Sequence, residues 1–326
     1  MVAVMNSKDH TGQIRSLDLS ADLNRVADLV ETCFPINRDP DGQTYIREMR
    51  RAARDYHLLG WLSQMDTVGT KKPAGFVWVE DEKIVGNLSL IPYKMNGRSI
   101  HLLANVAVHP QHRRKGIARA LTIRALDHLR RYGESEVWLQ VRHDNAAAID
   151  LYRSVGFSDQ AFRTTWRIRP IDVHQFNETE LHGCILRHRE NDDWEKQKRW
   201  LDCTYPHVIR WNLPLDFHRL HPGVLQSVSN FLDGITLRHW RVEVDGSILG
   251  WITWQKTRMF ANNLWLACRE DLEPTFLPGT LYKVLKKVNR RHSISIDYPF
   301  GRFQEGFTEL GFDHFRTLIW MKCRLN

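Results

Sequence analysis

The stretch HPQHRRKGIARAL, residues 109–121, decides how the rest of this chain is interpreted. It follows the apolar run HLLANVAV, which predicts a strand that ends before Pro110. An amphipathic helix is predicted after Gly116, because apolar residues recur there every four positions. These residues are Ile117, Leu121, Ala125 and Leu129. The stretch therefore joins a strand to a helix through a short basic loop that contains a glycine.

Such a junction favours an anion as ligand. The start of a helix presents unpaired backbone N–H groups and the positive end of the helix dipole. Gly116 and Ala118 leave room for an oxygen-rich group to approach the main chain. Four cationic side chains surround this point, and arginine can hold phosphate oxygens through two N–H groups. They are Arg113, Arg114, Lys115 and Arg119. A phosphate or pyrophosphate site is predicted, and the alternative is a solvated basic turn.

The composition is that of a globular protein with two domains. The chain has 326 residues, 42% of them hydrophobic and 26% charged, which is enough for two cores. The formal net charge of +8 favours an anionic partner. The five cysteines include no CxxC pair, so neither a disulfide framework nor a zinc site is indicated. No signal peptide or membrane span is recognised, which predicts a cytoplasmic protein without a membrane partner.

The two halves of the chain repeat one order of elements. The first half reads as strand, two helices, a hairpin (75–91), the strand before Pro110, the helix after Gly116, a strand (136–141), a short helix and a last strand (161–168). Ser20 is the predicted N-cap of the first helix. In the second half RVEVDGSILGWITW, residues 241–254, matches the hairpin, with Gly250 at the position of Gly86. An α/β (α+β) fold of two tandem domains is predicted, with boundaries at 11–168 and 169–326.

The second copy lacks the polar residues that make the first distinctive. It reads CREDLEPTFLPGTL where the first copy has VHPQHRRKGIARAL, so the basic loop is replaced by a segment with Glu270 and Glu273. Phe307 stands four residues before Gly311, where the first copy has Tyr152 four residues before Gly156. The second copy is therefore expected to act as a scaffold or as a wall of the acceptor site.

The first copy resembles the GCN5-related N-acetyltransferases (GNAT). Arg113-x-x-Gly116-x-Ala118 after a strand resembles the family's acyl-coenzyme A loop, Q/R-x-x-G-x-G/A. NAAAIDLYRSVGF, residues 145–157, is close to the family's N-x-x-A-x-x-L-Y-x-x-x-G-F. The resemblance covers residues 11–168 closely, and the tandem arrangement is similar to that of mycothiol synthase. It implies two domains that each have a mixed, mostly antiparallel sheet flanked by helices.

The resemblance also implies a role for each matched residue. The main chain of Val106 and Val108 would pair with the pantetheine arm of acetyl-CoA. Asn145 would contact that arm or hold the neighbouring strands apart, which is compatible with a simple N-cap role. Tyr152 would protonate the leaving thiolate, the alternative being a packing role. The pyrophosphate would be held by Arg113, Arg114, Lys115, Gly116, Ile117, Ala118 and Arg119.

The general base and the acceptor stay open. Several family members have glutamate where this chain has Asn105, and an amide cannot accept a proton at neutral pH. Water, His109 or a group from the second copy are the alternatives. His218 and His221 have metal-like spacing, but no third ligand is apparent and no metal is expected. The predicted activity is acetyl transfer to a small-molecule or peptide amine. The alternatives are a coenzyme A-binding regulatory or scaffolding protein and, last, a nucleic-acid-binding module, which is not expected.

Overall fold

The structure is a computed structural model that describes residues 12–34, 36, 39–63, 74–95, 97–169, 183–288 and 292–325. The predicted domain start at residue 11 lies outside these ranges. Contacts divide the chain into two compact units. The first consists of Met1–Gln140, Ala146–Ser158 and Met321–Asn326, and the second of Val141–Asn145 and Asp159–Trp320. The predicted boundary after residue 168 follows the sequence repeat and stays a prediction. The two compact units divide the chain elsewhere, because part of the last strand of each copy lies in the other unit.

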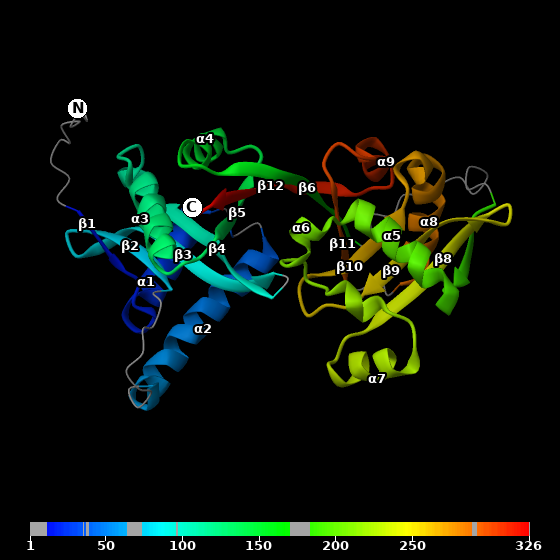
Figure 1. Cartoon of the computed structure of the whole chain (residues 1–326), viewed down its shortest axis with the longest axis horizontal. Helices are drawn as coiled ribbons and strands as arrows, with labels where there is room; N and C mark the ends of the chain where they lie inside the picture. Colours follow the sequence, from blue (N-terminus) through cyan, green and yellow to red (C-terminus); the bar gives the residue numbers. More distant parts are fainter. Residues whose placement is uncertain are drawn as a thin grey trace. The chain divides into compact units, whose positions relative to one another are not determined.

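The first unit is a mixed sheet with helices on both faces (Figure 1). Its elements are β1 (Gln13–Ser16), α1 (Leu19–Cys33), α2 (Pro40–Ser63), β2 (Gly75–Glu80), β3 (Lys83–Met95), β4 (Arg98–Val108), the 3-10 turn η2 (Pro110–His112), α3 (Ile117–Arg131), β5 (Glu136–Arg142) and α4 (Ala146–Ser154). The sheet order is β1-β2-β3-β4-β5, followed by the end of β12 (Asp313–Arg324). All pairs from β1 to β4 are antiparallel, and β4 is parallel to β5. The predicted mixed, mostly antiparallel sheet is confirmed.

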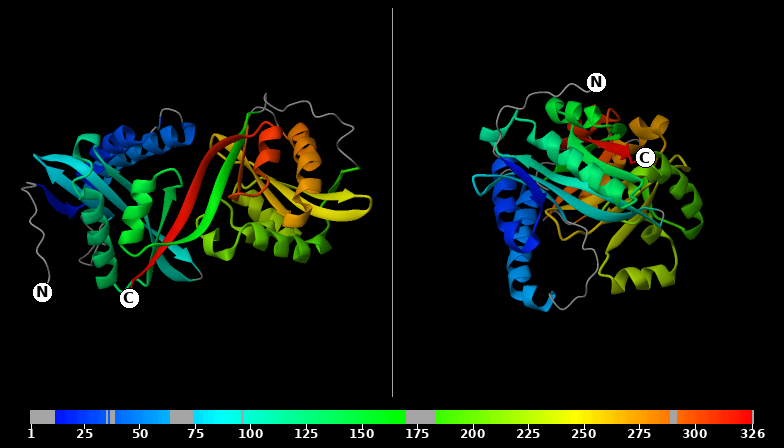
Figure 2. Two further views of the ribbon diagram at one scale, coloured as in Figure 1. Left: turned by 90° about the horizontal axis from the view of Figure 1, so that it is seen from above. Right: turned by 60° about the vertical axis from the view of Figure 1, so that its left-hand side comes forward.

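Two neighbouring residues of β2 show which helices cover which face of this sheet. Phe76 contacts His128 of α3, with ring centroids 5.5 Å apart. Val77 belongs instead to the cluster made by α1 and α2. Successive side chains of a strand point to opposite faces. Therefore α1 and α2 cover one face and α3 covers the other, as Figure 2 also shows.

The second unit repeats this plan with the same order of elements. They are β7 (Ile185–His188), the 3-10 turn η4 (Asn191–Asp193), α5 (Trp194–Thr204), α6 (His207–Arg210), the 3-10 turn η5 (Phe217–Leu220), α7 (Val224–Leu232), β8 (Leu237–Val244), β9 (Ser247–Gln255), β10 (Ala261–Cys268), the 3-10 turn η6 (Glu270–Leu272), α8 (Glu273–Lys287), β11 (Ser293–Pro299), α9 (Gln304–Glu309) and β12. The sheet order is β12-β6-β11-β10-β9-β8-β7, where β6 is Ser158–Ile168. Helix α8 packs on one face and α5 on the other.

Two glycines confirm the internal repeat at the level of packing. A Cβ added to Gly86 would lie 2.7 Å from the side chain of Ile117, at the start of α3. A Cβ added to Gly250 would lie 2.6 Å from the ring of Phe276 in α8. Real Cβ atoms do not approach other atoms this closely, so only glycine lets each helix pack directly on its strand. The two glycines predicted to correspond therefore serve the same purpose.

The last strand of each copy belongs to a different unit from most of that copy. Residues 159–168 of β6 lie in the second unit, although β6 closes the first copy of the repeat. Residues 321–324 of β12 lie in the first unit, although β12 closes the second copy. Each copy therefore contributes part of its final strand to the sheet of the other unit.

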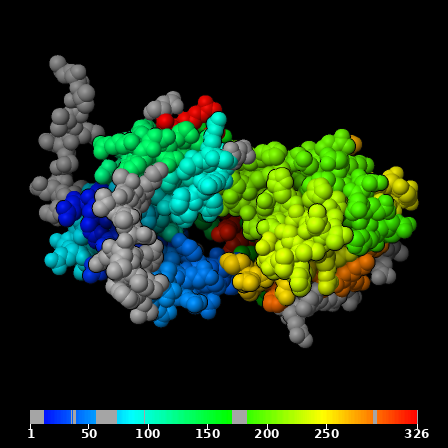
Figure 3. Space-filling view, turned by 60° about the horizontal axis from the view of Figure 1, so that its bottom comes forward, coloured from blue at the N-terminus to red at the C-terminus, as the bar shows by residue number. Residues whose placement is uncertain are grey.

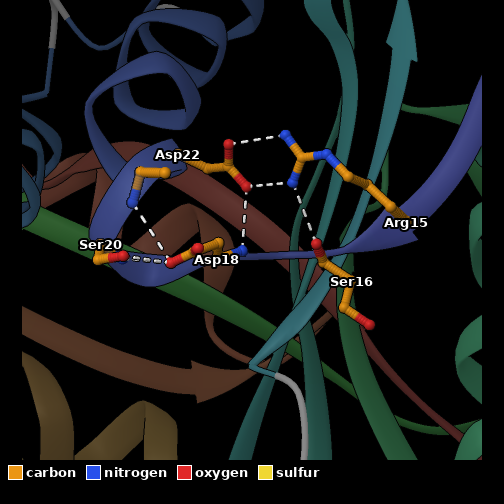
Figure 4. A network of polar contacts seen from close by, with 6 residues as sticks. Arg15, Ser16, Asp18, Ser20 and Asp22 are labelled. Atoms are coloured by element: carbon orange, nitrogen blue, oxygen red, sulfur yellow. Dashed lines mark hydrogen bonds and ion pairs between the residues drawn. The ribbon is translucent and has the colours of Figure 1, made fainter. Parts of the chain in front are cut away.

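The first helix starts in a different way from the prediction. Asp18, and not Ser20, is the N-cap of α1, and its carboxylate accepts hydrogen bonds from the backbone N–H groups of Ser20 and Ala21. Asp22, in the first turn, is buried and forms two hydrogen bonds with Arg15, at 2.5 and 2.8 Å (Figure 4). It also accepts a hydrogen bond from the backbone N–H of Asp18 at 3.0 Å. These contacts join β1 to α1.

We expect Asp22→Asn to lower the free energy of unfolding of the first unit by about 2 kcal/mol, because the charged hydrogen bonds to Arg15 are weakened. Asp28→Asn is the matched control, since Asp28 is also in α1 and pairs with Arg50 at the surface. It should cost less than about 1 kcal/mol. Urea titration measures both changes, and equal losses would contradict the prediction.

The difference between wild type and Asp22→Asn should also depend on pH. Burial alone would raise the pKa of the Asp22 carboxyl, but the hydrogen bonds from Arg15 and Asp18 hold this pKa below its usual value. The stabilisation is therefore fully present above the pKa of an unfolded aspartate, about 3.9, and is lost as the pH falls through the lower pKa of the folded state. A difference that stays constant into this acidic range would contradict the assignment.

No helix among the described residues is long and apolar enough to cross a membrane.

Candidate functional site

Strand β4 has an open edge in its second half. It pairs with β5 only between His101–Leu103 and Val137–Leu139, in parallel register. Beyond Leu103, β4 continues to Val108 while pairing only with β3 among the described residues. The side of β4 that faces away from β3 is therefore available along residues 104–108. An extended ligand could be added to this edge as a further strand.

A β-bulge lies at the point where β4 separates from β5. Ala104 faces Ser89, while Ala107 faces Asn87, so two residues of β4 stand opposite Leu88 alone. One of them, Asn105, has a left-handed backbone with φ of 51°. The buried side chain of Asn87 donates a hydrogen bond to the carbonyl of Asn105 at 2.8 Å. Asn87 therefore holds the bulge in place from the neighbouring strand.

The register of β3 and β4 tells which way the polar groups of the open edge point. The N–H of His109 donates to the carbonyl of Val85 at 2.9 Å, which makes the facing residues Gly86 and Val108 a non-hydrogen-bonded pair. The N–H and C=O groups of Val108 thus point away from β3, and alternation directs those of Val106 the same way. In this structure the Val108 carbonyl accepts hydrogen bonds from Arg113 and from the thiol of Cys33, each at 3.2 Å.

The start of α3 has no side-chain cap. Its N-cap is Gly116, which has φ of 79° and no side chain to accept a hydrogen bond. The first N–H groups of the helix, those of Ile117, Ala118 and Arg119, have no acceptor within the helix. Nothing lies within 4 Å of the place where a Cβ of Gly116 would be. The site thus combines free donors with free space, which is what an anion requires.

The cationic residues of the loop differ in their partners. Lys115 lies 3.7 Å from the carboxylate of Glu80. No carboxylate of the described residues pairs with Arg113, Arg114 or Arg119. Arg119 donates a hydrogen bond to the hydroxyl of Ser154 at 2.6 Å and so connects α3 to the end of α4. Three arginines therefore remain able to neutralise a bound anion.

Tyr152 lies on α4 with its ring packed against Phe157, 5.8 Å between centroids. Burial raises the pKa of its hydroxyl above the ordinary value, so the group stays protonated at neutral pH. No hydrogen-bond partner of this hydroxyl lies among the described residues. Asn145, the other residue predicted from the same motif, is exposed and falls in the second unit. The hydrogen bond from Arg119 to Ser154 connects the helix that carries Tyr152 to the basic loop, and the roles of Tyr152 and Asn145 stay predictions.

Sequence reasoning missed Tyr45. Its hydroxyl, on α2, accepts a hydrogen bond of 2.6 Å from the side-chain amide of Asn105 at the bulge. The Tyr45 side chain is 39% exposed, so a ligand at the bulge could reach its hydroxyl. No sequence signal joins these residues, because they are 60 positions apart and lie on different elements.

His109, one of the candidates for the base, lies at the basic end of β4. Its ring is 5.5 Å from that of His112, and its buried Nδ1 has no partner among the described residues. It follows Val106 by three positions, which corresponds to about 10 Å along a strand. His109 is therefore nearer to the basic loop than to the bulge.

The second copy has lost each of these features. The pairing of β9 with β10 is regular and has no counterpart of the Asn105 bulge. The N–H of Leu266 in β10 donates to the hydroxyl of Tyr205 at 3.3 Å, so the strand edge is capped by the protein itself. Helix α8 begins with Glu273, which is buried and accepts hydrogen bonds from Tyr298 and Arg302. A carboxylate thus stands at the helix start where the first copy has free donors.

Two further features of the sequence are the pair His218 and His221 and the five cysteines. Among the described residues no three His, Cys, Asp or Glu side chains gather as a metal site requires. His218 lies in η5, and the ring of His221 contacts the carbonyl of Pro222 at 2.7 Å. All five cysteines are free thiols.

Part of the chain is similar to known acetyltransferases. Residues 23–157 match the model of the acetyltransferase (GNAT) family. The ribosomal protein bS18-alanine N-acetyltransferase of Escherichia coli (strain K12) is 44% identical over 64 residues, which cover 20% of this chain and 43% of the relative. The mycothiol acetyltransferase of Geodermatophilus obscurus is 33% identical over 99 residues, covering 29% and 32%. The matched segments thus span less than half of either relative.

A solved structure extends the likeness to the whole chain. A GCN5-related N-acetyltransferase from Sphaerobacter thermophilus aligns with 97% of this chain and 96% of its own, with a TM-score of 0.56 and 14% identity. At this identity the likeness shows the fold alone.

Proposed function

We propose that this chain, whose residues 23–157 match the acetyltransferase (GNAT) family, transfers an acetyl group from acetyl-CoA to an amine. The observation that carries this proposal is the continuous path from the open edge of β4 to the uncapped start of α3. Neutral strand-edge groups suit the pantetheine amides, and three arginines without carboxylate partners suit the pyrophosphate. The names of the two relatives refer to an alanine of ribosomal protein bS18 and to mycothiol, and this chain's own acceptor is unidentified.

Each part of the path has a separate task in this proposal. The main chain of Val106 and Val108 binds the pantetheine arm, and Arg113 releases the Val108 carbonyl when that arm enters. A contact of Asn145, which lies in the turn between β5 and α4, with this arm stays a prediction from the sequence motif. The pyrophosphate is held by Arg113, Arg114, Lys115, Gly116, Ile117, Ala118 and Arg119. Acetyl-CoA supplies the thioester carbonyl that the amine attacks.

The reaction itself is a direct transfer. The nitrogen of a neutral amine bonds to the acetyl carbon, and the C–S bond breaks. The N–H of Val106 lies at the bulge and stabilises the developing oxyanion. Tyr152 gives its hydroxyl proton to the leaving sulfur, the proton of the amine leaves to water, and Tyr152 regains a proton from water before the next turnover. No carboxylate is needed at Asn105 in this scheme.

Tyr45 and Asn105 together orient the amine. Because the Asn105 amide donates to the Tyr45 oxygen, the hydroxyl proton and one lone pair of Tyr45 remain for a ligand. We place the amine and the water that takes its proton beside this hydroxyl. Asn105 is then a positioning residue for Tyr45 and takes no proton itself.

We expect Tyr45→Phe to lower kcat/KM for the amine about tenfold, mainly through KM, because one hydrogen bond to the acceptor is lost. Affinity for acetyl-CoA should not change. Thiol release measures the first quantity and calorimetry the second. Tyr132→Phe, at the exposed end of α3, is the control and should have wild-type kinetics. An unchanged KM for the amine would remove Tyr45 from the acceptor site.

A coenzyme A-binding regulatory or scaffolding protein is the second candidate, and Asn105 in place of a carboxylate favours it. The two candidates are separated by incubation with acetyl-CoA and a panel of small amines, amino sugars and peptides with free N-termini. Thiol release that depends on one amine supports the enzyme. Tight acetyl-CoA binding without release for any amine supports the scaffold. The cytoplasmic location and the absence of a nucleic-acid partner stay predictions.

A further inference from the structure

Helix α7 carries its apolar residues on the outside. No residue of this helix is buried. Its five large apolar side chains are 79%, 89%, 50%, 82% and 77% exposed, in the order Val224, Leu225, Val228, Phe231 and Leu232. Their spacing of one, four, seven and eight positions from the first places them along one stripe of the helix. Such a stripe normally faces a core, whereas here its side chains are exposed. Figure 1 shows α7 at the edge of its unit.

The polar face of α7 attaches the helix to its own unit and fixes this orientation. The side chain of Asn230 donates to the carbonyl of Arg219 at 2.9 Å. Arg219 in turn donates to the hydroxyl of Ser229 at 3.0 Å and pairs with Asp233 at 2.5 Å. The helix therefore cannot bury its apolar stripe by rolling without breaking these contacts. In Figure 3 the yellow-green segment that includes α7 lies at the front surface.

The charges around the stripe indicate what kind of partner it suits. Between Pro222 and Leu237 the chain has one charged residue, Asp233, and it is paired with Arg219. A helix that lies on an anionic membrane carries Lys or Arg on its polar face. Here the polar face is uncharged and is turned toward the protein. A lipid surface is therefore disfavoured, and an uncharged protein surface is favoured.

We propose that the α7 stripe is the centre of an interface between two copies of this chain. A two-fold axis brings the same patch of both copies together, so the patch must be complementary to itself. Near the axis the same residues of both copies lie close together, so charged side chains there would repel each other. The α7 stripe has no charged side chain, although the chain has a net charge of +8. With the axis at Val228, antiparallel helices place Leu225 of one copy against Phe231 of the other.

The expected dimer is reversible. A stable interface has about 20–30 residues a side, and the stripe supplies the hydrophobic centre of a smaller one. Association should therefore depend on protein concentration within the range that sedimentation velocity covers. This inference concerns a surface distant in sequence from the acetyl-transfer site and does not depend on the proposed activity.

The test compares the full chain with three variants by sedimentation velocity over a dilution series. Wild type should shift from dimer to monomer on dilution. Leu225→Lys and Phe231→Glu should each weaken dimerisation at least about tenfold, because each buries an unpaired charge. Ile123→Lys, which changes a 40% exposed side chain on α3, is the matched control and should behave as wild type. An equimolar mixture of Leu225→Lys and Phe231→Glu should dimerise again, since the two charges then face each other.

Several outcomes would overturn the proposal. A wild-type chain that is monomeric at every concentration has no such interface. A dimer that Leu225→Lys leaves unchanged, with wild-type circular dichroism, uses another surface. Wild-type binding to vesicles of neutral or anionic phospholipid, lost in Leu225→Lys without a change of oligomeric state, would assign the stripe to a membrane.

Discussion

Gly116→Glu is expected to abolish measurable acetyl-CoA binding in calorimetry, which corresponds to a loss of at least about 100-fold in affinity. The substitution puts a carboxylate at the start of α3, where the free N–H groups and Arg113, Arg114 and Arg119 would hold the pyrophosphate. Nothing lies within 4 Å of the new Cβ, so the side chain fits without a clash. The loss therefore comes from charge repulsion and from the occupied donors.

The control for this variant is Gly133→Glu. Gly133 lies just beyond the other end of α3 with φ of 72°, close to the 79° of Gly116, and its surroundings are equally open. Both substitutions thus force a side chain onto a left-handed backbone at a similar cost in stability. Gly133→Glu should bind acetyl-CoA with wild-type affinity. Wild-type affinity of Gly116→Glu would falsify the assignment of the loop.

Local patterns in the sequence were sufficient to predict this loop. Three signals coincide at one place: the end of a strand at Val108, glycine at 116 and the four-residue apolar spacing from Ile117 onward. Each of these depends on neighbouring residues alone. For the same reason the repeat was found from Gly86 and Gly250, whose close contacts with α3 and α8 reflect a local need for a small residue.

The bulge and its partners could not be predicted, because they depend on contacts between distant elements. Asn105 in the sequence indicated only the absence of a carboxylate. Its left-handed backbone follows from the register of β3 against β4, and its hydrogen bond reaches Tyr45 on α2. The buried Asn87 that holds the bulge was also missed. A polar residue in a strand carries no local sign of the contact it makes.

The exchange of final strands was missed for a related reason. An apolar-polar alternation predicts that residues 161–168 form a strand, but does not predict which strand they pair with. In the structure β6 pairs with β11 of the second copy, from Arg163 with Pro299 to Ile168 with Ile294. Sequence repeats and compact units therefore divide this chain at different places.

In the second copy, side chains of the protein occupy the places that correspond to the proposed site of the first copy. Tyr205 caps the N–H of Leu266, and Glu273 occupies the start of α8 with Tyr298 and Arg302 as partners. Burial raises the pKa of the Tyr298 hydroxyl, which therefore remains a hydrogen-bond donor to Glu273. These contacts contribute to the core of the second unit, whereas helix α3 of the first copy starts at Gly116 without a side-chain cap.

Tyr152→Phe is expected to lower the turnover number about 100-fold, while the dissociation constant of acetyl-CoA stays unchanged. The reason is that the phenyl ring still packs against Phe157, and only the hydroxyl that protonates the thiolate is lost. The matching position of the second copy supports this division. Phe307 there is fully buried and repeats the same backbone contact, with the N–H of Phe312 bonded to its carbonyl as that of Phe157 is bonded to Tyr152. Packing at this position therefore does not require a hydroxyl.

The pH dependence of turnover distinguishes a Tyr152 that donates a proton from a Tyr152 that only packs. Burial raises the pKa of the Tyr152 hydroxyl, so wild type should keep its acid protonated even at pH values where a free tyrosine, with a pKa of about 10, has lost its proton. Tyr282→Phe, which removes the hydroxyl of a buried tyrosine in α8, is the control and should not change turnover. If Tyr152→Phe turns over like wild type, the sulfur must take its proton from water, and Tyr152 serves packing alone. If turnover falls but acetyl-CoA affinity falls equally, the hydroxyl contributes to binding of the coenzyme and not to the protonation of the sulfur.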